Sequence, residues 1–583
     1  MGSYQGIVGR DPELAVLSDV VAGAAVGRGR LVLVEGAAGI GKTTLLRAAC
    51  ANYGEPEWQV LTARGLALEG EFSYGIVRQL IEPVRARAGP GEWDGLLGGA
   101  AGLAARALLA RFQPGERVAV WSGNCPEWVL LEFAAGLAGL TLVTVNPAYQ
   151  AEELAHVLGH SEAAGIFLAT ACRGNSLPAI LAEARAGNEP GDKQRLPRLR
   201  EVIPLEEWDR FCASGDGGSL AEVDPGRPAQ ILYTSGTTGR PKAAVLTHRG
   251  LTNNARLAAE AIGMRAGETL VNPMPLFHVA GCGLLTLGLA QTLGTHVIPP
   301  GFDPALTFEL TQAYRGVCIG GVPTMLTALL SHPSRTRYDL SCLRYALSGG
   351  APVPAELVRQ VEATFGVPFV ITFAQTESSC SITMSRVGDT PADRTETLGR
   401  PLPQTEVKIT DTKTGETVPC GTVGEICTRG YLVMPGYLGD PVATRAAIDR
   451  DGWLHTGDLG SMDSRGYCRI EGRIKEMIIR GGENIYPREI EAVLLSHPAV
   501  TAAAIVGIDD RFWGEVVGAA VSTSATAPPA EAELAEFCRA RLAHYKVPVR
   551  WLFTGALPMT ATGKIRKDVL SAQLAQATAQ DTH

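Results

Sequence analysis

Hydroxyl-bearing residues and glycines crowd positions 234–242, near the middle of the 583-residue chain. Four of these positions offer hydroxyl donors: Thr234, Ser235, Thr237 and Thr238. Gly236 and Gly239 allow backbone N–H groups to turn toward a ligand, and Lys242 adds a positive charge. This set of donors suits an anion with several oxygens, such as a triphosphate. A polar hairpin loop is the alternative that composition leaves open, because serine, threonine and glycine are common in turns.

A second glycine-rich segment, residues 36–44, lies between a strand-like run at 30–35 and a helix-like run at 45–49. Four residues set its G-x-x-x-x-G-K-T pattern: Gly36, Gly41, Lys42 and Thr43. Strand, loop and helix in this order are the context in which such a loop cradles phosphates. A P-loop ATPase also needs an acidic strand end for Mg²⁺ and a residue that orients the attacking water, and neither follows here. The segment therefore predicts a second phosphate site without independent ATPase activity.

The composition of the chain argues against several classes of function. The formal net charge is −8, so nothing marks the chain as a whole for nucleic acid or an anionic membrane surface. The most apolar run, residues 128–145, is interrupted by Glu132 and two glycines, which predicts a buried helix and strand and not a membrane span. Twelve cysteines without a C-x-x-C pair favour reduced thiols over disulfides or a zinc site. We therefore expect a cytoplasmic protein without a nucleic-acid partner, whose oligomeric state stays open.

Strands and helices must surround the candidate loop to hold it in place. Residues 117–121, 140–145 and 164–169 are apolar runs typical of buried strands, and helix-like segments alternate with them over 101–112, from Pro126 and over 152–158. This alternation predicts a mostly parallel α/β sheet. The last block, from about residue 474, is small and of α+β type, with a strand over 500–507 and a helix over 530–542. Residues from 571 onward are polar and alanine-rich, which predicts a frayed tail.

Six or more motifs over residues 101–567 resemble, in order, those of the adenylate-forming enzymes, which include acyl-CoA synthetases, firefly luciferase and peptide-synthetase adenylation domains. The motifs include the loop at 234–242, Thr372–Glu377, T-G-D at 456–458 and P-x-T-x-x-G-K at 558–564. The residues at 399–403 and the turn at 481–484 resemble fatty acyl-CoA synthetases. The resemblance implies a large α/β core of several subdomains at residues 99–473 and a small mobile α+β domain at 474–583. Residues 1–98 resemble instead an N-terminal fragment of the P-loop ATPase module of LuxR-type regulators.

The resemblance implies a role for each motif. At the reacting phosphate it implies Lys564, Thr238 and Glu377, and Glu377 is also the implied Mg²⁺ ligand. The residues implied to bind ATP are Thr234, Ser235, Gly236, Thr237, Thr238, Gly239, Lys242, Gly350, Ala351, Pro352, Phe373, Ala374, Gln375, Thr376, Asp458 and Arg473. Within this group Asp458 and Arg473 are implied at the ribose, and residues 350–352 at the adenine. Phe373 and Ala374 stand where the family has Tyr and Gly, so an aromatic face for the adenine is kept while the phenol hydroxyl is lost.

Other residues are implied around the acyl group and the thiol. The implied acyl pocket consists of His278, Val279, Gly281, Val322 and Gly349. Lys475 falls at the hinge about which the family's C-terminal domain rotates, and the path of coenzyme A is implied beside Gly481, Gly482 and Glu483. On its own, a histidine in apolar company such as His278 is more often a hydrogen-bonded core residue, so both interpretations of His278 stay open.

The implied reaction uses ATP, Mg²⁺ and, as co-substrate, coenzyme A. A carboxylate attacks the α-phosphate of MgATP to give acyl-AMP and pyrophosphate, and a thiol then displaces AMP. We expect a medium- or long-chain fatty acid, because no Asp lies in the F-H-x-x-G region to grip an amino group. Loading of an acyl or aryl acid onto an acyl carrier protein is one alternative, and an ATP-sensing regulator with a degenerate ligase core is another. The family's longer lead-in ahead of residue 117 is missing here, so an impaired enzyme is a third alternative.

Overall fold

The computed structural model describes residues 15–17, 100–186, 195–215, 220, 222–234, 241–481, 483–523, 529–559 and 565–580. The chain divides after Gly99 into two units, Met1–Gly99 and Ala100–His583. Several predicted site residues lie outside the described residues: Gly36, Gly41, Lys42, Thr43, Ser235, Gly236, Thr237, Thr238, Gly239, Gly482 and Lys564. The resemblance of residues 1–98 to a regulator module falls almost wholly outside them as well.

Seven described strands form a sheet in the order β18-β8-β7-β2-β1-β3-β6. They are β1 (Arg117–Trp121), β2 (Thr141–Thr144), β3 (Gly165–Leu168), β6 (Glu201–Pro204), β7 (Pro228–Thr234), β8 (Lys242–Thr247) and β18 (Gly436–Tyr437). The strands from β7 to β6 pair in parallel, while β8 and β18 are antiparallel to their neighbours. Strands β2 and β3 are buried along their whole length, which is typical of strands covered on both faces. The predicted mostly parallel sheet is confirmed.

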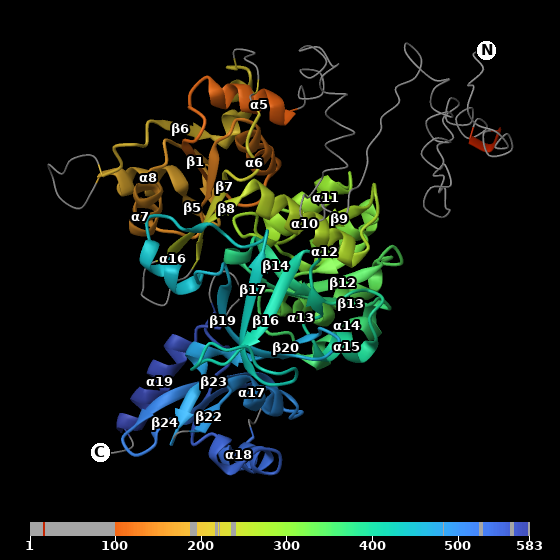
Figure 1. The fold of residues 1–583 in the computed structure, drawn as a ribbon, viewed down its shortest axis with the longest axis vertical. Coiled ribbons are helices and arrows are strands. Elements are labelled where there is room, and N and C mark those ends of the chain that lie inside the picture. The colour runs from red at the N-terminus through yellow and green to blue at the C-terminus, as the bar shows by residue number, and fades with distance from the viewer. Residues whose placement is uncertain are drawn as a thin grey trace, which may run out of the picture. The chain divides into compact units, whose positions relative to one another are not determined.

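Helices pack around this sheet (Figure 1): α5 (Ala100–Leu109), α6 (Pro126–Leu137), α7 (Ala151–Ser161), α8 (Leu177–Ala186) and α9 (Trp208–Cys212). Short elements complete the region: β4 (Ala171–Cys172), β5 (Asn175–Ser176) and the 3₁₀ turn η2 (Leu205–Glu207). Helix α6 begins at Pro126, as predicted, because proline is well accepted at a first helical position. Helix α5 contributes Ala104, Ala107 and Leu108 to the core, each fully buried. This predicted helix therefore holds part of the core in place ahead of β1.

Helix α6 also turns an acidic side chain, Glu132, into the core, where it is 7% exposed. Gln230 of β7 donates a hydrogen bond from Nε2 to Glu132 Oε1 at 2.5 Å, and Cys282 Sγ lies 3.4 Å from Gln230 Oε1. The second oxygen, Glu132 Oε2, has no hydrogen-bond partner among the described residues. Burial disfavours the charged carboxylate and raises the pKa of Glu132 from 4.5 to about 8, against the opposing effect of the Gln230 hydrogen bond.

This buried acid should make the stability of the protein depend on pH. Between its ordinary pKa and about 8, the folded protein keeps a proton on Glu132 that the unfolded chain releases, so stability falls as pH rises through that window. Glutamine has nearly the same shape and does not titrate. We expect Glu132→Gln to remove this decrease, by at most about 1.4 kcal/mol per pH unit. Urea unfolding near pH 6 and near pH 8 measures it, with the exposed Glu183→Gln as control. Parallel pH profiles for wild type and Glu132→Gln would contradict the prediction.

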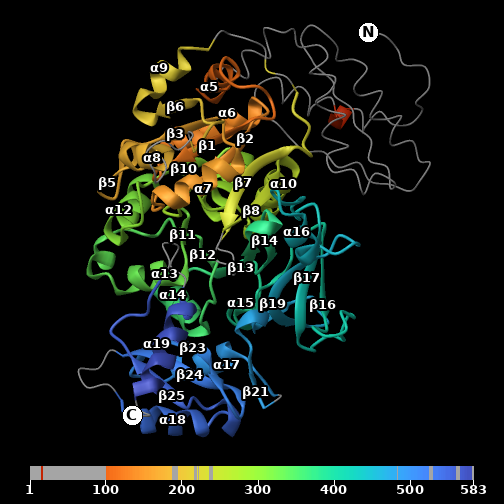
Figure 2. The same cartoon turned by 90° about the vertical axis from the view of Figure 1, so that its left-hand side faces the viewer.

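A second sheet follows in the order β11-β12-β13-β14-β15. Its strands are β11 (Cys318–Gly320), β12 (Tyr345–Gly349), β13 (Phe369–Gln375), β14 (Cys380–Met384) and β15 (Arg400–Pro401). The first three pair in parallel and the last two are antiparallel. Figure 2 shows this sheet near the helices α12 (Pro304–Tyr314), α13 (Pro323–Ser331), α14 (Ala355–Phe365) and α15 (Pro391–Glu396). The 3₁₀ turns η4 (Pro333–Arg337) and η5 (Thr376–Ser378) belong to the same part of the chain.

Between the two sheets in sequence lie α10 (His248–Ile262), the paired strands β9 (Thr269–Val271) and β10 (Thr295–Val297), the π-helical segment η3 (Ala280–Thr286) and α11 (Leu287–Gln291). Helix α10 begins after Thr247, whose Oγ1 accepts a hydrogen bond from the N–H of Gly250. Four antiparallel strands complete the core in the order β16-β17-β19-β20. They are β16 (Thr405–Thr410), β17 (Gly424–Gly430), β19 (Leu454–Met462) and β20 (Cys468–Arg473), accompanied by α16 (Pro441–Ala447).

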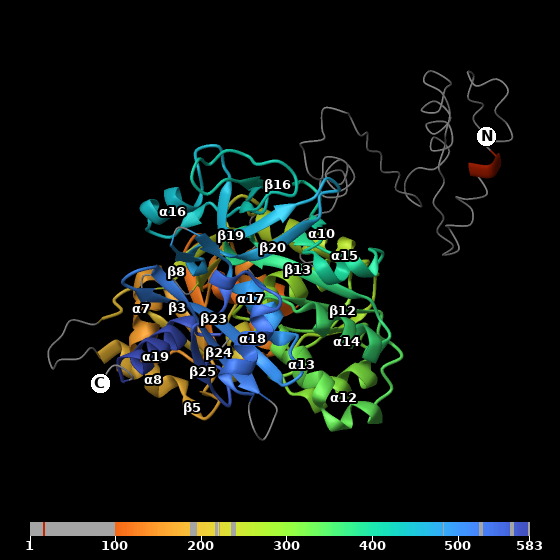
Figure 3. The same cartoon turned by 90° about the horizontal axis from the view of Figure 1, so that it is seen from below.

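The C-terminal part is small and of α+β type, as predicted, and has a sheet of its own (Figure 3). Its strands are β21 (Ile478–Arg480), β22 (Glu483–Ile485), β23 (Val500–Asp510), β24 (Gly514–Thr523) and β25 (Arg550–Phe553). Its helices and turns are η6 (Ile474–Glu476), α17 (Pro487–Leu495), α18 (Glu531–Arg539), η7 (His544–Lys546) and α19 (Lys567–Gln580). In the described part of the chain, no helix is both long and apolar enough to cross a membrane.

The predicted frayed tail from residue 571 is wrong. Helix α19 continues to Gln580, because Leu570 and Leu574 lie four positions apart on one face and are buried against Ile508 and Ala520. Two buried leucines at helical spacing outweigh the polar and alanine-rich composition that suggested fraying. The segment after the P-x-T-x-x-G-K motif is thus anchored to the C-terminal sheet.

Candidate active site

A cavity of about 1320 Å³ lies at the carboxyl ends of the parallel strands. Its lining includes Ser122 after β1, Asn146 after β2, Thr234 at the end of β7, Gly349 at the end of β12 and Gln375 at the end of β13. This edge of an α/β sheet is where ligands usually bind. Residues 454–457 of β19 and residues 473–475 also line the cavity. The fold therefore brings together segments that are far apart in the sequence.

The two ends of the central glycine-rich loop are both at this cavity. Thr234 and Lys242 pair across the β7–β8 hairpin, and Thr234 Oγ1 donates to the carbonyl oxygen of Lys242 at 3.4 Å. The ammonium of Lys242 lies 4.9 Å from the centre of the Tyr437 ring, within range of a cation–π interaction. Residues 235–240 lie outside the described residues. A positive charge and a hydroxyl therefore mark the point where the loop meets the cavity.

Glu377 lies in the turn η5, directly after β13, and lines the cavity beside Thr376. The hydroxyl of Tyr437 donates a hydrogen bond to Glu377 Oε1 at 2.8 Å. Burial and the neighbouring Glu377 carboxylate both raise the pKa of Tyr437, so the phenol keeps its proton and remains a donor. The contact of Tyr437 with Glu377 could not be predicted from the sequence, because nothing in its local pattern points to a glutamate 60 positions away.

The wall assigned to adenine is formed only in part by the predicted residues. Of residues 350–352 only Gly350 lines the cavity, beside Ala374, Gln375 and the predicted acyl-pocket residue Gly349. At Gly349 an added Cβ would lie 2.5 Å from the carbonyl oxygen of Thr372, so only glycine allows this approach of β12 to β13.

Phe373 is placed differently from the expectation that its ring faces the adenine. Side chains alternate along β13, so Thr372 and Ala374 face the cavity, while Phe373 joins Phe369 and Ile371 in the core. The Phe373 side chain is 8% exposed and is not part of the cavity lining. The exchange of the family's tyrosine for phenylalanine therefore suits a position in the apolar core.

Asp458, Arg473 and Gln375 meet at one edge of the cavity. Asp458 pairs with Arg473 across β19 and β20, and Arg473 Nε lies 2.8 Å from Asp458 Oδ1. Gln375 donates from Nε2 to Asp458 Oδ2 at 2.7 Å and to the carbonyl oxygen of Thr456 at 2.8 Å. The Asp458 carboxylate is 2% exposed and lies behind the lining residues Gln375 and Arg473. These contacts fix its orientation at the place predicted for the ribose.

The turn before Asp458 is held by two residues that the sequence analysis did not single out. Glu425 accepts a hydrogen bond from the N–H of Gly457 at 2.9 Å through Oε1. Its Oε2 lies 2.8 Å from His455 Nδ1. Both side chains line the cavity. Glu425 reaches this turn because its strand, β17, pairs with β19. A single sequence does not reveal this pairing, so Glu425 could not be found from the sequence.

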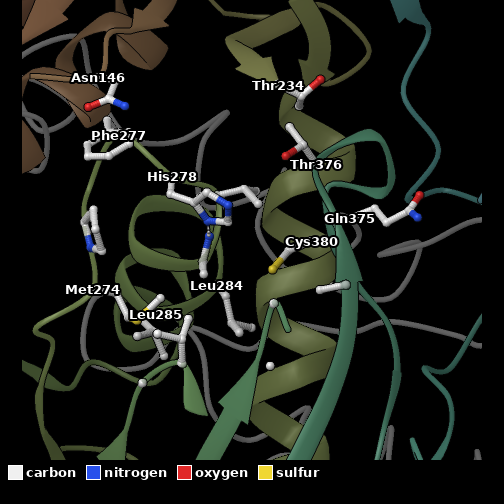
Figure 4. A pocket seen from close by; sticks show the side chains of 18 of the residues that line it. Asn146, Thr234, Met274, Phe277, His278, Leu284, Leu285, Gln375, Thr376 and Cys380 are labelled. Carbon is white, nitrogen blue, oxygen red and sulfur yellow. Dashed lines mark hydrogen bonds between the residues drawn. The ribbon is translucent and has the colours of Figure 1, made fainter. Parts of the chain in front are cut away.

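The far end of the cavity is apolar (Figure 4). Met274, Leu284 and Leu285 lie there, away from Thr234 and Thr376, whereas Phe277 lies beside Asn146. The lining residues between positions 270 and 325 include no lysine, arginine, aspartate or glutamate. These residues can therefore accept an apolar chain, and the charged lining residue Arg173 lies outside this stretch of the sequence.

The predicted acyl-pocket residues lie near this apolar end, with one exception. His278, Val279, Val322 and Gly349 line the cavity, and Gly281 does not. His278 Nδ1 accepts a hydrogen bond from the N–H of Ala280 at 3.2 Å, so the neutral ring carries its proton on Nε2. At Gly281 an added Cβ would lie 2.2 Å from the carbonyl oxygen of Pro275, which requires glycine for packing. The assigned contact of Gly281 with an acyl chain stays a prediction.

The predicted hinge lies between two anchored positions. Lys475 lines the cavity, and on its N-terminal side Arg473 is held by Asp458. On its C-terminal side Glu476 Oε2 lies 2.7 Å from Lys567 Nζ, which also lies 2.8 Å from Glu491 Oε1. Burial opposes the charge of Lys567, but the carboxylates of Glu491 and Glu476 outweigh it and raise its pKa.

The turn predicted to border the coenzyme A path is only partly described. Gly481 has a φ of 59°, and an added Cβ would lie 2.9 Å from Cε3 of Trp513, so this position favours glycine. Glu483 is exposed at the start of β22. Neither residue lines the cavity. The assignments of Gly481 and Glu483 therefore stay predictions, as do those of Gly482 and Lys564 outside the described residues.

Family models, related sequences and solved structures all match this chain to one enzyme family. The AMP-binding enzyme family model matches residues 99–438, and that of the AMP-binding enzyme C-terminal domain matches residues 489–564. "Putative acyl-CoA synthetase YngI" of Bacillus subtilis is 41% identical over 477 residues, covering 78% of this chain and 86% of that protein. The mitochondrial medium-chain acyl-CoA ligase ACSF2 of Rattus norvegicus is 34% identical over 500 residues, covering 81% of each chain. ATP-bound MatB from Rhodopseudomonas palustris matches with a TM-score of 0.75 at 29% identity, covering 82% of this chain and 93% of that chain.

Proposed function

Because this chain belongs to the AMP-binding enzyme family and is an AMP-forming acyl-CoA ligase, we propose that its acid substrate is an apolar monocarboxylic acid, a medium- or long-chain fatty acid. The enzyme activates an acid with ATP to acyl-AMP and pyrophosphate. The thiol of coenzyme A then displaces AMP and forms the thioester.

The apolar end of the cavity supports the proposed acid substrate. The lining residues between positions 270 and 325 include no lysine, arginine, aspartate or glutamate, so a second carboxylate that contacted these residues alone, away from the lining residue Arg173, would lie unpaired in an apolar site. Burial of an unpaired charge costs several kcal/mol, whereas each buried methylene contributes about 0.8 kcal/mol. An apolar chain with a single carboxylate fits this lining best. The name of the rat relative, a medium-chain acyl-CoA ligase, agrees with this choice.

We propose Glu377 as the protein ligand of Mg²⁺. Its carboxylate lies at the cavity wall next to the hydroxyl of Thr376, and oxygen donors of this kind are those that Mg²⁺ prefers. One protein carboxylate is enough, because the ion takes its other ligands from phosphate oxygens and water. The bound ion supplies positive charge that offsets the negative charge of the phosphates. The residues present therefore fit the group.

The protein's own residues complete the proposed arrangement for the first half-reaction. Lys242 and the loop at 234–240 hold the β- and γ-phosphates, while Asp458, oriented by Arg473, accepts the ribose hydroxyls. Lys564 and Thr238 act at the α-phosphate, where an anionic nucleophile must approach a polyanion. For the second half-reaction the C-terminal domain rotates about Lys475 and carries the 481–484 turn toward the site.

The proposed cellular location of the protein rests on the state of its cysteines. The eleven that the structure describes are all free thiols, six of them buried. Free thiols in this number suit a reducing compartment. We therefore keep the cytoplasm as the proposed location.

A matched pair of acids tests the proposed substrate. Octanoate should support pyrophosphate release and, with coenzyme A, a thioester identified by mass. Suberate has the same chain length and a second carboxylate, and we expect its kcat/KM to be lower by about a hundredfold or more, because each 1.4 kcal/mol is a factor of ten. Equal rates with the two acids would overturn the proposed substrate class. Product formed only with an acyl carrier protein would overturn coenzyme A as acceptor.

A further inference from the structure

Tyr437 contacts two charged groups of the candidate site at once. Its hydroxyl donates to Glu377 Oε1 at 2.8 Å, and its ring centre lies 4.9 Å from Lys242 Nζ. All three side chains line the cavity. They come from three separate places in the fold, namely β18, the turn after β13 and the start of β8. One aromatic side chain thus links a carboxylate to an ammonium group.

The backbone around Tyr437 is held on both sides. Strand β18 pairs with β8, with Tyr437 opposite Ala244, and the N–H of Leu438 donates to the carbonyl oxygen of Ala243 at 2.8 Å. The N–H of Tyr437 donates to Thr444 Oγ1 at 3.0 Å. These bonds fix the position of the ring relative to β8, the strand that carries Lys242.

The geometry keeps two opposite charges apart. Among the described residues no salt bridge joins Lys242 to Glu377, although both line one cavity. A direct ion pair would neutralise both groups and turn the carboxylate away from a metal ion. The phenol instead binds the ammonium through its ring face and the carboxylate through its hydroxyl, without adding a charge. Because the hydroxyl engages Oε1, the other oxygen of Glu377 remains for a cation.

We propose that Tyr437 is a positioning residue for magnesium and ATP, which orients the Glu377 carboxylate toward the metal and the Lys242 ammonium toward the phosphates. The proposal rests on the proposed magnesium role of Glu377. It assigns Tyr437 to the first half-reaction only, since thioester formation from acyl-AMP involves no β- or γ-phosphate.

The variant Tyr437→Phe tests the hydroxyl while the ring stays in place. We expect the Mg²⁺ concentration for half-maximal pyrophosphate release to rise about tenfold, the size of one lost hydrogen bond to a charged group. Saturating Mg²⁺ should restore most of the rate, and thioester formation from preformed acyl-AMP should stay unchanged. Mn²⁺ binding in the presence of a non-hydrolysable ATP analogue, followed by electron paramagnetic resonance, should weaken by the same factor.

A matched control comes from Tyr467. Its hydroxyl also donates to a carboxylate, Asp389 Oδ1 at 2.8 Å, and the Arg465 guanidinium also lies over its ring, at 4.7 Å. Tyr467 does not line the cavity, so Tyr467→Phe should leave the Mg²⁺ dependence unchanged.

An unchanged Mg²⁺ curve for Tyr437→Phe, or an equal loss in both half-reactions, overturns the positioning role. Glu377→Gln separates this result from a failure of the premise. If Glu377→Gln shifts the Mg²⁺ curve and Tyr437→Phe does not, the role of Tyr437 alone is wrong. If neither variant shifts it, the magnesium role of Glu377 is wrong as well.

Discussion

Replacement of Lys564 by alanine is expected to slow acyl-AMP formation by roughly 10²-fold or more, the usual effect of losing a group that stabilises developing charge in a transition state. In this reaction a carboxylate must approach the α-phosphate of a polyanion. A positive charge near the oxygen atoms of the α-phosphate therefore lowers the barrier to acyl-AMP formation. Thioester formation from preformed acyl-AMP should be spared, because that step no longer involves pyrophosphate. Pyrophosphate release and the acyl-CoA product, measured separately, give the two rates.

Arg566→Ala is the matched control for this variant. Arg566 follows Lys564 by two positions, and its guanidinium is half-exposed and paired with Asp568 at 2.7 Å. Both half-reactions should keep their wild-type rates in this control. An equal loss of the two half-reactions in Lys564→Ala would show that the role proposed for Lys564 is wrong.

The second large effect is expected at Asp458. Asp458→Asn keeps the side-chain size but replaces a charged acceptor of ribose hydroxyls with an amide. Hydrogen bonds to charged groups contribute about 1.5–3 kcal/mol each, so we expect kcat/KM for ATP to fall by roughly 10²-fold. The KM of the acid should change little, because the apolar end of the cavity contains neither Asp458 nor its partners Arg473 and Gln375. Initial rates at varied ATP and varied acid separate the two parameters.

Asp393→Asn controls for the loss of a buried carboxylate as such. Asp393 is 6% exposed and pairs with Arg465 at 2.8 Å, as Asp458 pairs with Arg473. Arg465 does not line the cavity, whereas Arg473 does. Its replacement should lower the melting temperature without raising the KM of ATP. If both variants raise the KM of ATP equally, Asp458 acts through stability and not through the ribose.

Local patterns predicted several elements of the first sheet and two of the C-terminal part, because such patterns depend on residues close in sequence. The strand over 117–121 was predicted with its observed bounds, and the helix over 530–542 differs from the observed α18 by one to three residues at its ends. The tail failed for the opposite reason. Composition suggested fraying, whereas tertiary packing of Leu570 and Leu574 against the C-terminal sheet holds the helix.

The candidate site shows the same division. Motif positions such as Glu377, Gln375 and Lys242 were found from the sequence, and the structure places all three at the cavity. Phe373 was misplaced, because its motif position does not say which face of β13 its side chain takes. Tyr437 received no role, because its partner lies 60 positions away and only the pairing of β18 with β8 brings them together. Long-range pairing is the information that a single sequence lacks.

The two anchored positions beside Lys475 have a consequence for how a domain rotation would proceed. Arg473 is tied to Asp458 on one side, and Glu476 is tied to Lys567 on the other, so only Ile474 and Lys475 lie between the anchors. A joint this short has few dihedral angles to vary, so a domain rotating about it would explore few orientations compared with one on a flexible linker. Each orientation is then visited often, and little conformational entropy is lost when one of them is adopted. In the proposed rotation, the joint would act as a short hinge with few accessible orientations.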